Sequence, residues 1–169
     1  MTAQAEAATA TQASTQPAAG KVKVATIWLD GCSGCHMSFL DMDERLVELA
    51  EKIEIVYSPF VDAKTLPSQV DVGIIEGSIS NEEDEHKARL FRDRCKLLVS
   101  LGDCAVNGNV PAMRNPFKLE TVYERAYLEN VNVNQQIPTD GVPALLKTVR
   151  PVHGVVDVDR RALGRALPD

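Results

Sequence analysis

Cysteines are the residues of this sequence best suited to metal or redox chemistry, and two of them are paired by their spacing. Cys32 and Cys35 form a CxxC motif, CSGC, directly after an apolar run. Two thiolates at this spacing can hold one metal centre or exchange a disulfide. Because a helix is predicted to begin beside them, its dipole and free N–H groups are expected to favour the thiolate form of both cysteines.

A third cysteine, Cys104, follows another apolar run in the segment Gly102-Asp103-Cys104. If the two runs are parallel strands of one sheet, their carboxyl ends meet at one edge and the three sulfurs converge there. Cys95 immediately precedes the second run, so a strand of about six residues, rising ~3.3 Å each, separates it from Cys104 by roughly 20 Å. We therefore interpret Cys95 as a small buried apolar residue.

Three converging cysteines leave several kinds of chemistry open. An iron–sulfur cluster would use all three as thiolate ligands. A thioredoxin-like protein would use Cys32 and Cys35 as a reversible disulfide, with Cys104 as a bystander. A zinc site would require a second closely spaced pair of ligands, and the sequence contains no obvious one. A structural disulfide framework is disfavoured, since the chain is neither small nor rich in cysteine.

The elements that must position these cysteines alternate between strand and helix. The predicted strands are 21–29, 53–58, 70–77 and 96–102, and the predicted helices are 36–51 and 82–95. Such alternation is typical of right-handed crossovers in a parallel α/β sheet, with ligands in the loops at the carboxyl ends of the strands. Beyond Cys104 the pattern weakens, and it indicates a helix at 119–129, a helical turn at 142–147 and a strand at 152–158.

Other candidate functional residues lie in or near these loops. Glu76 follows the apolar run VGII at a strand end, which suits either a carboxylate that caps a nearby backbone amide or a group beside the metal site. His36 could donate a hydrogen bond to a metal-bound sulfur, but we expect a solvated histidine in the first helical turn. Met113 and Arg114 suit either a partner contact or a structured loop of the chain's own fold.

Bulk composition restricts the class of protein further. The chain has 169 residues, 44% of them hydrophobic, which suits one globular domain with a real core. Its net charge of −6, without a basic cluster, argues against nucleic acid as a partner. Residues 1–20 have no export-signal pattern and are predicted to form a disordered tail. No segment is apolar enough to span a membrane, so a cytoplasmic location is expected.

Four longer segments, in this order, resemble the small subunit of soluble, bidirectional NAD-reducing nickel–iron hydrogenases. They are GCSGCHMSFLDMDE (31–44), EGSISNEE (76–83), GDCAVNGNVPAMRN (102–115) and PVHGVVDVD (151–159). The chain is more remotely similar to the cluster-bearing 20 kDa subunit of respiratory complex I, which usually has adjacent cysteines in place of CxxC. The resemblance implies a flavodoxin-like parallel sheet with helices on both faces, spanning residues 21–159.

The same resemblance implies one 4Fe-4S cluster, proximal to a nickel–iron site in a separate large subunit. Its ligands would be Cys32, Cys35 and Cys104, and Gly31, Glu76 and Gly102 would line it. The chain would relay electrons between H2 and NAD without catalytic residues of its own, together with the large subunit and flavin and iron–sulfur diaphorase subunits. FMN is not supported by any residue pattern in the sequence.

The resemblance fails at the family's fourth ligand, the cysteine of a Gly-Cys-Pro-Pro motif. Residues 160–169 read RRALGRALPD, and Arg165 stands where that cysteine is expected. A guanidinium has no lone pair to give to iron. We therefore expect an irregular C-terminal part and a truncated or out-of-frame end. The alternatives are a three-cysteine cluster with an exchangeable fourth corner, or a docking subunit that has lost its cluster.

Overall fold

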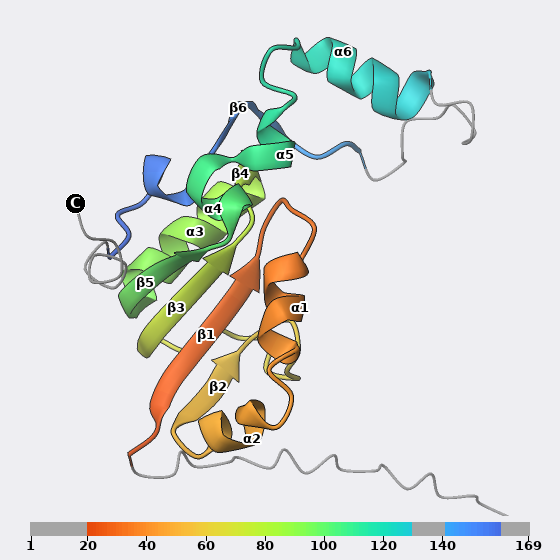
Figure 1. Cartoon of the computed structure of the whole chain (residues 1–169). Coiled ribbons are helices and arrows are strands. Elements are labelled where there is room, and N and C mark those ends of the chain that lie inside the picture. Colours follow the sequence, from red (N-terminus) through yellow and green to blue (C-terminus); the bar gives the residue numbers. More distant parts are fainter. Residues whose placement is uncertain (1–19, 130–140, 160–169) are drawn as a thin grey trace, which may run out of the picture.

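The computed structural model describes residues 20–129 and 141–159, and its centre is a four-stranded parallel sheet (Figure 1). The strand order is β2-β1-β3-β5. The strands are β1 (Val22–Trp28), β2 (Ile53–Tyr57), β3 (Val70–Glu76) and β5 (Cys95–Leu101). This is the strand order with which flavodoxin-like sheets begin, and the predicted α/β class is confirmed.

The register of the sheet aligns the ends of three strands. Trp28 of β1 is the register partner of Glu76 of β3, and Glu76 is the partner of Leu101 of β5. The loops that follow these three residues therefore leave the sheet at the same level. The CxxC motif and the segment that carries Cys104 follow the first and the third of these residues.

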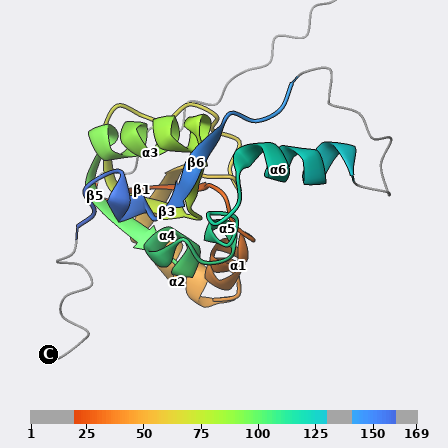
Figure 2. The ribbon, with the colours of Figure 1, turned by 90° about the horizontal axis from the view of Figure 1, so that it is seen from above.

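Helices cover both faces of the sheet. Figure 2, viewed from above, shows α1 (Gly34–Leu40) and α2 (Arg45–Ala50) on one face and α3 (Glu82–Arg94) on the other. Ala88 and Phe91 of α3 are buried in the same core cluster as Ile75 and Leu98 of the sheet. A capping box starts α3, since the Asn81 side chain accepts a hydrogen bond from the backbone N–H of Asp84 at 2.9 Å.

The prediction of one helix over 36–51 was wrong, because the structure has two short helices there. Helix α1 begins two residues earlier, at Gly34, and α2 begins at Arg45. Between them Asp43 has φ 48°, in the left-handed region that a continuous helix cannot include. Aspartate tolerates this conformation better than most side chains.

A second, two-stranded sheet lies beyond the main one and was not predicted. Strand β4 (Ile79–Asn81) pairs antiparallel with β6 (Leu145–Arg150). The helical turn predicted at 142–147 was therefore wrong. The strand predicted at 152–158 was also wrong, since Val152–Gly154 form a 3-10 turn and no strand follows it up to residue 159.

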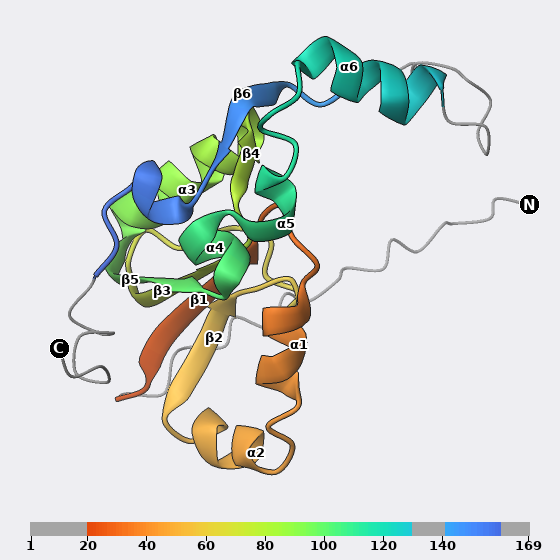
Figure 3. The same cartoon turned by 45° about the horizontal axis from the view of Figure 1, so that its top comes forward.

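The remaining helices gather near the carboxyl ends of the strands. Figure 3 shows α4 (Asp103–Asn107) and α5 (Asn109–Ala112) above that edge of the sheet. Helix α6 (Leu119–Tyr123) continues into a π-helical turn (Glu124–Leu128), which confirms the helix predicted at 119–129. Within residues 20–129 and 141–159, no helix is long and apolar enough to cross a membrane.

Both chain ends for which we made predictions lie mainly outside the described residues. This applies to the tail expected at 1–20, of which the structure describes only Gly20, and to the whole segment 160–169 with Arg165. The predicted domain boundaries therefore stay predictions.

Candidate functional site

Three of the four cysteines lie at the carboxyl edge of the sheet. Cys32 lies in the loop after β1, Cys35 is the second residue of α1, and Cys104 is the second residue of α4. A Cβ built on Gly31 would lie 3.7 Å from the Sγ of Cys104, and one built on Gly102 would overlap the Sγ of Cys35. The loops after β1 and β5 therefore face each other, and the structure brings these five predicted site residues together.

Glycines allow this close approach of the loops. Gly102 has φ 85°, and it has no room for a side chain against Cys35. Gly77 has φ 86°, and a Cβ there would lie 2.7 Å from the backbone carbon of Leu29. Both positions combine the left-handed region with a close contact, so both require glycine.

The electrostatic environment of the thiols agrees with their convergence. Burial raises the pKa of Cys35, as do the nearby Glu76 carboxylate and the charges of Cys32 and Cys104. Burial also raises the pKa of Cys104, followed by Cys32 and the carboxylates of Asp103 and Asp30. The expectation that the helix N-terminus would favour the thiolate is therefore wrong for Cys35. Thiols that oppose one another's ionisation are deprotonated most readily when a bound cation offsets the negative charges of the thiolates.

Cys95 is separated from the other three cysteines. It begins β5, whereas Cys104 follows the end of that strand. Its side chain is 4% exposed and packs against Gly73, where a Cβ would lie 3.0 Å from the Cβ of Cys95. Burial raises the pKa of the Cys95 thiol to about 11. The interpretation of Cys95 as a buried apolar residue is confirmed.

Glu76 joins the end of β3 to the start of α1. Its carboxylate accepts hydrogen bonds from the backbone N–H groups of Cys35, at 3.2 Å, and His36, at 2.9 Å. The side chain of Ser33, the residue before α1, makes no capping hydrogen bond. Glu76 therefore caps α1 from a different element, and it also lies close enough to Cys35 to raise the pKa of the thiol. Its two predicted roles, capping and proximity to the cysteine site, coincide.

The expectation of a solvated His36 was wrong. This residue is only 2% exposed, and its Nδ1 contacts the Glu76 carboxylate. Its Nε2 lies 2.9 Å from Thr26 Oγ1. The rings of Trp28 and Phe60 pack edge-on against the imidazole, with centroids 5.5 and 5.4 Å away. His36 lies in the first turn of α1 as predicted, but these contacts turn its side chain toward the sheet.

Some residues that hold the loops together were not predicted from the sequence. Asp30 and Ser78 form a backbone bridge, in which the N–H of Ser78 donates to Asp30 O at 2.7 Å and the N–H of Asp30 donates to Ser78 O at 3.1 Å. This antiparallel bridge ties the loop after β1 to the loop after β3. Thr26 could have been noticed, since it is a hydroxyl residue inside the apolar run VATIW.

The donor set at this edge consists of sulfur. Within the described ranges, no group of three or more His, Cys, Asp or Glu side chains stands close enough to ligate a single metal ion. A cluster spans several atoms, so its cysteines stand farther apart than the ligands of one ion. Three thiols on facing loops offer the kind of ligand that iron–sulfur clusters use. The remaining cysteine of the chain, Cys95, cannot supply the fourth corner.

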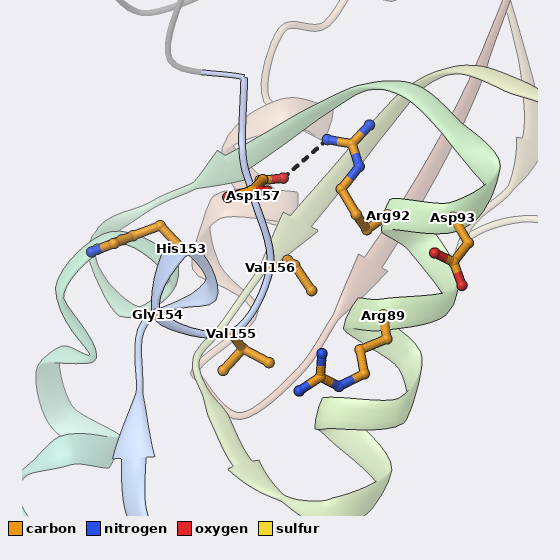
Figure 4. Close-up of a pocket in the computed structure, with 8 residues that line it drawn as sticks. All are labelled: Arg89, Arg92, Asp93, His153, Gly154, Val155, Val156 and Asp157. Carbon is orange, nitrogen blue, oxygen red and sulfur yellow. Dashed lines mark hydrogen bonds between the residues drawn. The ribbon is translucent and has the colours of Figure 1, made fainter.

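A separate hollow of about 520 Å³ lies between α3 and residues 153–157 (Figure 4). Its arginines are already engaged: Arg92 donates to Asp157 O at 3.0 Å, and Arg89 donates to the Glu85 carboxylate. Figure 4 shows His153 pointing away from both arginines. Both arginines are therefore held by groups of this chain.

Comparison with known proteins gives a consistent result. Residues 32–164 match the family model described as NADH ubiquinone oxidoreductase, 20 Kd subunit. The chain is 43% identical over 145 residues to the delta subunit of the NAD-reducing hydrogenase HoxS of Cupriavidus necator, and the alignment covers 83% of this chain and 69% of that protein. It is also 39% identical over 140 residues to one subunit of the F420-non-reducing hydrogenase vhu of Methanocaldococcus jannaschii.

The structural comparison agrees with these alignments. One chain in the crystal structure of an NAD+-reducing [NiFe]-hydrogenase in the H2-reduced state superposes with a TM-score of 0.75 and 37% identity. The superposition covers 82% of this chain and 79% of that one. The alignment with the Methanocaldococcus protein covers 82% of this chain but 49% of the relative, so the chain spans about half the length of that protein.

Proposed function

Since the chain belongs to the family of the 20 kDa subunit of NADH ubiquinone oxidoreductase, we propose that it is an electron-transfer subunit of an NAD-linked nickel–iron hydrogenase. In this role it carries no catalytic residue for hydrogen activation. It holds a 4Fe-4S cluster and relays electrons between H2 and NAD through partner subunits. Support comes from relatives named as hydrogenase subunits and from the likeness to a chain of an NAD+-reducing [NiFe]-hydrogenase.

The observation that carries this proposal is the convergence of Cys32, Cys35 and Cys104 at one edge of the sheet. These three thiolates would hold three corners of the cluster, and solvent or a side chain of a partner would fill the fourth; the cluster when bound supplies reversible one-electron transfer. The residues of the chain contribute placement: the glycine at 102 lets the two loops close around the sulfurs, and Glu76 fixes the backbone at Cys35. The protein thereby controls the position and burial of the cluster, the two properties that tune electron transfer.

A large partner subunit would cover the exposed side of this site. Cys32 itself is exposed. Met37 on α1 is 44% exposed, and Val110 and Met113, at α5, are 65% and 70% exposed. Figures 1 and 3 show α5 beside the loop that joins β1 to α1. We assign this apolar surface to contact with the nickel–iron large subunit, and flavin and iron–sulfur subunits that reduce NAD would complete the assembly.

Arg114 is not part of that assigned surface. Its guanidinium donates to the backbone oxygens of Ser80 at 2.8 Å and Leu146 at 2.9 Å. It therefore links β4 to β6 within the chain's own fold. Of the two neighbours proposed from sequence, only Met113 is available to a partner.

Single cysteine substitutions test the proposal. The full chain is co-expressed anaerobically with the large subunit, and iron and acid-labile sulfide are measured per chain. Cys104→Ser is expected to lose most of the iron, because it removes a ligand, whereas Cys95→Ser retains it. If both variants bind as much iron as the wild type, the assigned ligand set is wrong.

A further inference from the structure

A chain of buried polar side chains runs from the cysteine site to the loop after β2. Thr26 Oγ1 donates to Ser58 Oγ at 2.8 Å, and His36 connects Thr26 to Glu76. The four residues are only 2% to 6% exposed. Ser58 Oγ also accepts a hydrogen bond from the N–H of Phe60 at 3.3 Å. Burying polar side chains costs free energy unless they are hydrogen-bonded, and each of these four side chains has a partner.

The imidazole of His36 has little freedom to move. Both of its nitrogens have partners, and the rings of Trp28 and Phe60 enclose it. The void next to it, lined in part by Thr26, Phe39 and Phe60, holds only about 10 Å³. A space of that size accommodates at most one water molecule, so the ring cannot turn away from Glu76.

The orientation of Cys35 depends on the Glu76 carboxylate. Helix α1 has only 7 residues and makes no side-chain cap of its own, so the carboxylate is the group that holds its first N–H groups. Helix propensity contributes little to so short a helix. A Glu76 carboxylate released from its place would leave the N–H groups of Cys35 and His36 unpaired.

We propose that His36 is a positioning residue for the cysteine site. It holds the Glu76 carboxylate against the backbone of Cys35 and thereby fixes the Cys35 thiol relative to Cys32 and Cys104. This inference rests on the proposed function, because it assigns His36 a role in retaining the metal centre that those three cysteines hold. Groups that orient metal ligands commonly change metal affinity about 10- to 100-fold when they are removed.

The test uses the full chain, purified anaerobically with its partner, and measures the rate at which an excess of a strong iron chelator removes iron. We expect His36→Leu to release iron at least about tenfold faster than the wild type and to change the EPR line shape of the reduced protein. His86→Leu is the control, since His86 is an exposed histidine on α3. It should leave both readouts unchanged.

Two conservative variants separate positioning from simple filling of space. The amide of His36→Asn can place a donor near the position of Nδ1, toward Glu76, whereas that of His36→Gln reaches nearer the position of Nε2. If His36 acts by positioning Glu76, the His36→Asn variant should retain iron better than the His36→Gln variant. A purely structural histidine predicts the reverse, because Gln fills more of the ring's volume. This comparison decides the question even if His36→Leu fails to fold.

The outcomes distinguish the inference from the proposed function. If the wild-type protein contains no iron or sulfide, the proposed function fails. If the wild type holds a cluster and His36→Leu shows the same release rate and the same EPR spectrum, the positioning role is overturned and the proposed function stands. If Gln equals or exceeds Asn in iron retention, positioning through Glu76 is likewise overturned.

Discussion

Gly102 and Cys35 lie so close together that a Cβ on Gly102 would overlap the Sγ of Cys35. The two residues come from loops 67 positions apart in the sequence (102 minus 35) that meet at one edge of the sheet. The contact shows that the loop after β5 closes over the first turn of α1. A site built from these loops therefore depends on a glycine as well as on cysteines.

Substitution of Gly102 by Ala should disrupt the cysteine site. The added methyl group would displace Cys35, and φ 85° with ψ 166° lies in a region that only glycine adopts readily, so backbone strain adds about 1 to 3 kcal/mol. Gly141→Ala is the matched control, since Gly141 has φ 87° but no atom within 4 Å of the added Cβ. We expect Gly102→Ala to lose most of its iron while Gly141→Ala keeps it. Equal iron per chain in the two variants would contradict the assigned packing.

The place of the cysteines could be predicted because it follows from the order of strands and loops. Parallel strands put the loops after Leu29 and Leu101 at one edge of the sheet. The length of the strand between Cys95 and Cys104 was enough to predict that Cys95 lies at the opposite edge. Glu76 was found for the same reason, since it ends the strand between them. The apolar runs that define these strands are visible in the sequence without any knowledge of tertiary contacts.

Features that depend on distant contacts could not be predicted. His36 is buried because Glu76, Thr26, Trp28 and Phe60 surround it, and these residues come from three other segments of the chain. Strand β6 forms by pairing with β4, so its own short pattern looked equally suited to a helical turn. The break at Asp43 is a single backbone conformation that periodicity does not reveal.

The buried thiol of Cys95 should make stability depend on pH in the alkaline range. Its pKa is raised to about 11 in the folded chain, whereas an unfolded thiol ionises near about 8.5. The unfolded state therefore releases its proton first, and the stabilising contribution of Cys95 is lost as pH rises from about 8.5 through about 11. Urea unfolding of the metal-free full chain between pH 7 and pH 10.5 measures this loss.

Cys95→Ala provides the comparison for that pH dependence. It lacks the titrating thiol but keeps the other three cysteines, so its stability should decline less steeply over the same range. Removing the sulfur also leaves a small void against Gly73, which costs on the order of 1 kcal/mol at neutral pH. If the free energy of unfolding declines equally with pH in the wild type and in Cys95→Ala, the burial of Cys95 does not govern the ionisation of its thiol.

Substitutions of Arg114 and Met113 should separate effects on the stability of the chain from effects on its assembly with a partner. Arg114→Ala removes two hydrogen bonds from a charged donor to the oxygens of Ser80 and Leu146. It should lower the free energy of unfolding by about 2 kcal/mol. Met113→Ala changes a side chain that is 70% exposed, so it should leave the free energy of unfolding within about 0.5 kcal/mol of the wild type.

The same two variants test the proposed partner surface. Met113→Ala should weaken co-purification with the large subunit, since it trims the exposed apolar surface at α5. Arg114→Ala, assayed at a temperature at which it is folded, should bind the partner almost as well as the wild type. Normal assembly of Met113→Ala and impaired assembly of folded Arg114→Ala would place the interface elsewhere.

The central claim is that Cys32, Cys35 and Cys104 hold an electron-carrying iron–sulfur cluster, and EPR spectroscopy of the reduced complex tests it most directly. The full chain is purified anaerobically with its large subunit, wild type beside Cys104→Ser, and iron and sulfide are measured on the same samples. We expect about four irons per chain, with a reduced 4Fe-4S signal that Cys104→Ser abolishes or changes. A wild-type chain without that signal, or a signal that Cys104→Ser leaves unchanged, would contradict this ligand assignment.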